Sequence, residues 1–423
     1  MDGDPVVESE LDSFSLTFPL PYRVAFLVTL AVWGWGLNLH YLHSIKIDVP
    51  SLIRYTGRTA SPQLSHHRST YRFATFLTAA SALSLATFWL FTRRDPTLVL
   101  AYDWLPMLNL VVLAVLFVAP LRPLAVSHTG RRRTLATLRR ISVGGLAEPG
   151  DGKFGDVLLA DALTSYAKVI GDLYVCLCMF LVARGRSAAA FAAATARPDR
   201  ACGGPVVVPL ILAVPSAIRL RQCLVEYARE RGAPRRDAAA GSGRQHLANA
   251  LKYATAFPVI ILSALMRNGG GGRGGGTLLF RTWLVAALVN SLYSFYWDVA
   301  KDWDLTLFAG ARERNAPNQP FGLRPRLHVH RPVVYYLVMA LDLLLRCTWS
   351  LKLSPHLDHL ADYEGSIFLL EFLEIFRRWV WIFFRVETEW IRNTSTGLGD
   401  EDILLGNFQG NGSKYADEDE DED

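Results

Sequence analysis

The sequence lacks the cysteine pattern of a metal site and the loop of a nucleotide site. Only five cysteines are present, and the closest pair, Cys176 and Cys178, lies inside an apolar run. Structural zinc sites space their cysteines and histidines differently, so no metal is expected. The glycine-rich tract at 268–276 is not followed by Lys-Ser or Lys-Thr, which favours a flexible connector over a phosphate-binding loop. We therefore expect neither a cofactor nor a nucleic-acid partner.

Basic residues are also missing from the N-terminal segment. Residues 1–15 contain no Lys or Arg and several carboxylates, among them Asp2 and Glu8. A cleavable signal peptide starts with a basic flank, so none is expected here. The first apolar segment is instead expected to direct insertion into a membrane.

Apolar residues dominate the rest of the chain. Its 423 residues are 51% hydrophobic and 20% charged, and the mean hydropathy is +0.20. Apolar stretches of about 20 residues, enough to cross a bilayer as helices, recur along nearly the whole length. The predicted fold is an all-α polytopic membrane protein with about nine transmembrane helices. The candidate spans are 22–42, 73–92, 98–121, 157–183, 205–223, 247–267, 278–299, 332–353 and 366–386.

Charge in the loops predicts the topology. Alternate loops carry most of the Lys and Arg, including Arg131-Arg132-Arg133 and Arg235-Arg236. The positive-inside rule makes this set cytosolic, which leaves the N-terminus lumenal and the C-terminus cytosolic. The loop holding Arg184 and Arg200 is the exception, because it is basic but falls on the lumenal side.

Residues 128–145 combine arginines with Leu135, Leu138 and Ile141 at helical spacing. This pattern is typical of an interfacial helix on anionic cytosolic lipid. An ordinary basic loop that obeys the positive-inside rule explains it equally well.

Ionisable residues inside the apolar spans are the best indication of function. Each costs several kcal/mol at membrane depth unless it is paired or hydrated, so charges on several helices indicate a shared polar cavity. Arginines with a lysine suit a multivalent anion, since guanidinium groups match phosphate oxygens in geometry. We expect Asp302, Asp304, Arg385 and Glu389 to be helix-end charges at the interface instead.

Six ordered motifs over about 150–395 resemble those of the EXS family of eukaryotic phosphate exporters. They begin at Leu159, Ile218, His246, Tyr293, Leu345 and Glu374, and the last reads Glu374-Ile-Phe-Arg377-Arg378-Trp-Val-Trp381. The first motif departs from the family's Asp-Gln-x-Asn-Ser, because Ala162 and Thr164 replace the two amides. The family's longer members begin with an SPX domain that senses inositol pyrophosphates. Since no room for one precedes Tyr22, regulation by that ligand is not expected.

The resemblance implies four segments and a phosphate site. The segments are an acidic lumenal stretch (1–21), N-terminal helices with a basic linker (22–150), an EXS-like transmembrane domain (151–395) and a disordered acidic cytosolic tail (396–423). Trp349 is the implied gate, although a Trp of the interfacial belt is the alternative. The implied phosphate-binding residues are Asp161, Ser165, Lys252, Tyr253, Asp298, Arg346, Glu374, Arg377 and Arg378.

The leading hypothesis is that the chain is no enzyme but a phosphate transporter or channel. The short fungal members of the family imply a Golgi membrane, with the endoplasmic reticulum as a second location, and support of glycosylation and protein retention. The alternative is a membrane adaptor that binds Golgi glycosyltransferases or retrieval machinery without transport. A membrane enzyme is the weakest alternative, since no lumenal His/Asp constellation is visible. A homodimer is compatible with the sequence, but no motif requires one.

Two cysteines leave a further question open. Cys178 and Cys202 can both approach the lumenal face, where an oxidising compartment permits a disulfide. We expect Cys178 to be a buried thiol.

Overall fold

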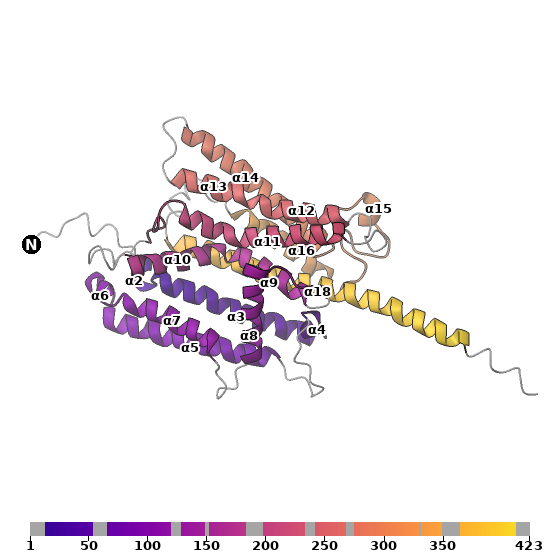
Figure 1. Ribbon diagram of the computed structural model, residues 1–423, viewed down its shortest axis with the longest axis horizontal. Helices are drawn as coiled ribbons and strands as arrows, with labels where there is room; N and C mark the ends of the chain where they lie inside the picture. Colours follow the sequence, from indigo (N-terminus) through magenta and orange to yellow (C-terminus); the bar gives the residue numbers. More distant parts are fainter. Residues whose placement is uncertain are drawn as a thin grey trace, which may run out of the picture.

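The computed structural model describes residues 13–53, 66–119, 128–148, 152–182, 198–232, 242–267, 275–329, 331–348 and 364–411. All regular structure in these ranges is helical, which confirms the predicted all-α fold, and the helices form an elongated bundle (Figure 1). Short π-helical turns occur at Arg140–Gly144 and Asp298–Asp302. The α-helices are α2 (Ser13–Thr17), α3 (Leu20–Ser44), α4 (Val49–Leu52), α5 (His66–Thr92), α6 (Pro96–Ala101), α7 (Trp104–Val118), α8 (His128–Arg139), α9 (Lys153–Ser165), α10 (Ala167–Val182), α11 (Val207–Gly232), α12 (Ser242–Ala254), α13 (Ala256–Arg267), α14 (Gly275–Trp297), α15 (Ala311–Arg314), α16 (Pro332–Arg346) and α18 (Glu364–Asn411).

Fewer helices than the nine predicted have the length and composition of a membrane span. Among the described residues, 6 helices qualify, or 7 if the bent pair α9 and α10 is one span. The helix α16 has only 15 residues, and α18 carries Glu371, Glu374, Arg377 and Arg378 within its apolar part. The fold is that of a polytopic membrane protein, but the count of nine is not confirmed.

Three irregularities in the helices coincide with residues of the predicted site. The pair α9 and α10 bends by 64° just after Ser165, α12 ends at Ala254 directly after Lys252 and Tyr253, and α14 passes into a π-turn that starts at Asp298. Such π-turns inside helices are frequent at functional sites. The irregular backbone therefore places side chains from three helices toward the bundle interior.

The helix α18 runs through the bundle and beyond it (Figure 1). Its residues Trp381, Phe384 and Val386 are buried in one apolar cluster with Trp303 and Tyr335. Burial of such side chains contributes about 2 kcal/mol each. The helix continues past residue 395 to Asn411, and the domain boundaries at 150/151 and 395/396 remain predictions.

A disulfide joins Cys178 of α10 to Cys202 in the connection to α11. The expectation that Cys178 is a free thiol was therefore wrong. The two cysteines are 24 positions apart in the sequence. Gly203 directly follows Cys202 in the turn that leads to α11, and its φ is +80°. A side chain at Gly203 would collide with the Tyr174 hydroxyl, so this tight turn requires glycine.

The basic segment after α7 does form a helix, α8, as the spacing of Leu135 and Leu138 predicted. Its Arg131 is buried and donates hydrogen bonds to the carbonyls of Leu116 and Ala119, both at 2.6 Å, at the end of α7. These bonds satisfy carbonyl groups that a helix end leaves free. Contact between α8 and anionic lipid remains a prediction.

Candidate functional site

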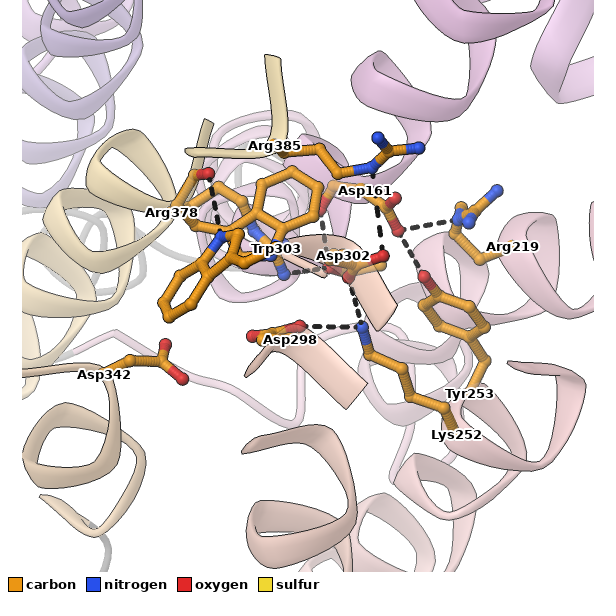
Figure 2. Close-up of polar contacts among 12 residues, drawn as sticks. Asp161, Arg219, Lys252, Tyr253, Asp298, Asp302, Trp303, Asp342, Arg378 and Arg385 are labelled. Atoms are coloured by element: carbon orange, nitrogen blue, oxygen red, sulfur yellow. Dashed lines mark hydrogen bonds and ion pairs between the residues drawn. The ribbon is translucent and has the colours of Figure 1, made fainter. Parts of the chain in front are cut away.

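Asp298 is the centre of the charged cluster. It is fully buried and accepts a hydrogen bond from Lys252 Nζ at 2.9 Å. Arg346 binds its second oxygen, and Arg377 Nη1 lies 3.6 Å from the same atom. The side chains come from α12, the π-turn after α14, α16 and α18, so one carboxylate joins four elements. Figure 2 shows Asp298 with its bond to Lys252.

Arg377 is held by two further carboxylates. Its Nη1 donates to Asp342 Oδ1 at 2.9 Å, and its Nη2 donates to Glu374 Oε1 at 2.6 Å. Asp342 also accepts a bond from Arg346 Nε at 3.0 Å. Because each arginine shares its carboxylates with the other, their positions are fixed relative to each other without a ligand.

Asp161 forms the second half of the cluster. Arg219 Nε donates to its Oδ1 at 2.7 Å, and the Tyr253 hydroxyl donates to the same oxygen. The opposite side of Arg219 binds Gln222 Oε1 at 2.6 Å. Figure 2 shows Asp161 between Arg219 and Tyr253, beside the group around Lys252.

Arg378 differs from the other arginines of the site because its hydrogen-bond partners are neutral. Its Nε donates to Ser165 Oγ at 2.9 Å and its Nη2 to Thr164 Oγ1 at 3.1 Å. Ser165 in turn donates to Glu374 at 2.7 Å. Among the described residues, Nη1 of Arg378 is buried without any hydrogen-bond partner, and no carboxylate forms an ion pair with this guanidinium. The guanidinium also lies over the Trp381 ring, 4.6 Å from its centroid.

Asp302 ends the π-turn, but its side chain belongs to the buried cluster and does not reach the interface as expected. One carboxylate oxygen is 3.3 Å from Lys252 Nζ and the other is 3.9 Å from Arg385 Nε. Arg385 and Glu389 form a separate pair at 3.0 Å. Asp304 is more than half exposed, as expected for a helix-end charge.

The structure brings together nine residues of the predicted site, while Trp349 lies outside the described residues. Three charged members of the cluster were missing from the predicted set, namely Asp302, Arg219 and Asp342. Arg219 follows the apolar first half of α11, and Asp342 is one helical turn before Arg346. The sequence contains a signal for Arg219, because a charge within a membrane span needs a partner. It also contains one for Asp342, because Asp342 and Arg346 are at positions i and i+4 and adjoin on a helix.

Carboxylates and cations are equally numerous in this cluster, so its charges balance. The space beside Asp342 and Arg377 has no room for a water-sized sphere. Arg219, Arg346 and Arg377 are thus occupied by protein carboxylates, and an anion that binds one of these three must displace at least one carboxylate. The carboxylates are Asp161, Asp298, Asp302, Asp342 and Glu374, and the cations are Arg219, Lys252, Arg346, Arg377 and Arg378.

A helical bundle with several membrane-spanning helices around a buried, charge-balanced cluster defines a polytopic membrane protein with an interior polar site. The sequence pattern of the EXS family matches residues 18–391. The chain belongs to the EXS family.

Relatives fall into short and long proteins. The chain is 30% identical to Protein ERD1 homolog 1 of Schizosaccharomyces pombe, over 90% of the chain and 93% of that protein. It is 27% identical to the SPX and EXS domain-containing protein 1 of Dictyostelium discoideum, over 90% of the chain but 38% of that protein. The match to human Solute carrier family 53 member 1 has 28% identity and covers 60% of the chain and 35% of the relative.

Proposed function

We propose that this protein is an inorganic-phosphate transporter or channel of the Golgi membrane that returns lumenal phosphate to the cytosol. The observation that carries the proposal is Arg378, a buried arginine with a free Nη1 and no ion-pair partner among the described residues. A desolvated guanidinium without a directly bonded carboxylate is unfavourable, and an anion would supply that ion-pair partner and an acceptor for Nη1.

The surroundings of Arg378 suit a tetrahedral anion. Arg377 is adjacent in sequence, and Ser165 lies between Arg378 and Glu374 as a hydroxyl that can donate to an oxyanion. A phosphate at Arg378 would compete with Glu374 for Arg377 and for the Ser165 hydroxyl. Such competition keeps binding weak enough for release, which transport requires.

One relative supports the same class of activity, because Solute carrier family 53 member 1 is named as a carrier. The short relative Protein ERD1 homolog 1 matches over nearly its whole length. By resemblance to the short Golgi members of the family, transport here would support glycosylation and the retention of ER and Golgi proteins.

The test is phosphate flux into liposomes that contain the purified protein. We expect flux above that of empty liposomes for the wild type and its loss, by about a hundredfold, in R377A/R378A, since each lost charge-assisted contact costs about 1.5–3 kcal/mol. The control is R312A/R326A, which removes the same charge from two exposed positions. Equal flux in wild type and R377A/R378A would contradict the assigned site.

The same protein tests the adaptor alternative. An adaptor predicts co-purification of Golgi glycosyltransferases that survives in R377A/R378A, together with no flux from any variant. Wild-type flux that depends on the two arginines is incompatible with an adaptor that does not transport.

A further inference from the structure

A second charged cluster lies where α3, α10 and α18 meet, at the end of the bundle that carries the disulfide. Its best-paired member is Glu364, the first residue of α18. Arg23 Nη1 donates to it at 2.7 Å, and Arg200 donates through Nη1 at 2.6 Å and Nη2 at 3.0 Å. Burial lowers the pKa of the Arg200 guanidinium, but its bonds to Glu364 and the charge of Asp172 outweigh this and raise the pKa above its ordinary value. Arg200 therefore stays charged.

Two carboxyl groups of this cluster are poorly paired. Asp172 is buried, and Arg200 Nε approaches it only to 3.8 Å, which is too long for a hydrogen bond. Glu371 is 5% exposed and has no hydrogen-bond or ion-pair partner among the described residues. Apolar side chains surround this part of the interface, including Val175 and Ile375. A carboxylate in such a position is costly unless it holds a proton.

Charged and titratable groups face Asp172 and Glu371 from α3, α10, α18 and the connection before α11. Asp172 and Glu371 repel each other when both are ionised, while the cations nearby are not bonded to Glu371. The groups concerned are Lys168 and Cys176 on α10, Arg23 on α3, Arg200 in the connection before α11, and Glu364 on α18.

Glu371 also adjoins the central cluster. It precedes Glu374 by three residues on α18, so the two side chains lie one turn apart on the same side of the helix. With 38% of its side chain exposed, Glu374 is the most accessible carboxylate of the central cluster. Along α18, Glu371 lies between Glu364 of this second cluster and Arg377 of the central cluster.

We propose that Glu371 and Asp172 form a proton-binding site at the entrance of the anion path, and that phosphate moves faster when this site is protonated. The inference rests on the proposed transport function. Protonation removes negative charge from the route of the phosphate anion. Loss of the proton restores a negative charge one helical turn from Glu374 and repels the anion.

The test is phosphate flux in liposomes with the same pH on both sides, at about pH 5.5 and about pH 7.5. We compare E371Q, a permanently uncharged mimic, with the wild type at each pH. Because phosphate speciation is identical in both samples, the ratio of their fluxes isolates the protein group. At the higher pH we expect the phosphate flux of E371Q to exceed that of the wild type by about fivefold, because one nearby negative charge is removed. At the lower pH we expect the two fluxes to be equal.

E389Q is the matched control on α18, because Glu389 is paired with Arg385 away from this cluster. Its flux ratio to the wild type is expected to be the same at both pH values. D172N is the second test variant, should E371Q fail to fold, and is expected to change the ratio in the same direction as E371Q.

The two proposals fail in different ways. Wild-type flux no greater than that of empty liposomes at either pH would refute the transport function itself. Wild-type flux with an E371Q or D172N ratio that is constant with pH would refute the proton-binding site and leave the transport function standing.

Discussion

Arg377 and Arg378 are adjacent in the sequence but differ in their surroundings. Three carboxylates surround Arg377, namely Asp298, Asp342 and Glu374. Within the described part of the chain, Arg378 donates hydrogen bonds to hydroxyl groups and lies over an aromatic ring, and no carboxylate is paired with it. Arg377 thus resembles a structural ion pair that an anion must break, and Arg378 resembles an open binding group.

This difference predicts the effect of R378K. Lysine keeps the charge but loses the planar fork that binds Ser165 and Thr164 while Nη1 stays available for an anion. We expect phosphate flux to fall by about tenfold, with little change in thermal stability. Liposome flux and the melting temperature in detergent measure the two effects. Wild-type flux in R378K would show that charge alone, and not the fork, is used.

Asp161 and Arg219 are a buried pair, and their contribution can be separated from the rest of the site. In R219L, Asp161 loses its cation and keeps only the Tyr253 hydroxyl, which we expect to destabilise the protein by about 3–5 kcal/mol. The double variant D161N/R219L removes the unpaired charge, so its melting temperature is expected to lie above that of R219L. A double variant less stable than R219L would contradict this pairing.

At the scale of the helices, the sequence predicted the positions of most elements but not the contacts between them. The spans near α3, α5, α11 and α14 were predictable because each is a long apolar run. The site residues were predictable because charges stand out in such runs. Which cation pairs with which carboxylate was not, since pairing depends on the bend after Ser165 and on the π-turn at Asp298, and neither has a signature in the sequence.

The disulfide fixes the segment that carries Arg200 against α10. We expect C178S/C202S to lose about 3 kcal/mol of stability, the chain-entropy value for a loop of this length. A reductant is expected to lower the wild-type melting temperature and leave C178S/C202S unchanged. C347S, which removes a cysteine outside the disulfide, serves as the control. Equal melting temperatures for wild type and C178S/C202S would contradict a stabilising role.

At the scale of the whole molecule, the disulfide also bears on the orientation of the bundle. The connection between α10 and α11 is basic, and the positive-inside rule alone would place it in the cytosol. Disulfides form in oxidising compartments, so the bond between Cys178 and Cys202 favours the lumenal side instead. The Arg200–Glu364 ion pair offers a reason for the exception, because this arginine is bound inside the protein and not at the lipid surface.

A glycosylation test decides the orientation. The substitution A193N creates an Asn-Ala-Thr acceptor in the connection between α10 and α11. If this connection is lumenal, A193N expressed in a eukaryotic cell is expected to gain a glycan, seen as a mobility shift that an endoglycosidase reverses. The natural Asn393-Thr-Ser sequence lies on the opposite, cytosolic side in the predicted topology, so N393Q is expected to cause no shift. A glycan lost in N393Q and absent from A193N would invert the topology, and the Glu371 end of the anion path would then face the cytosol.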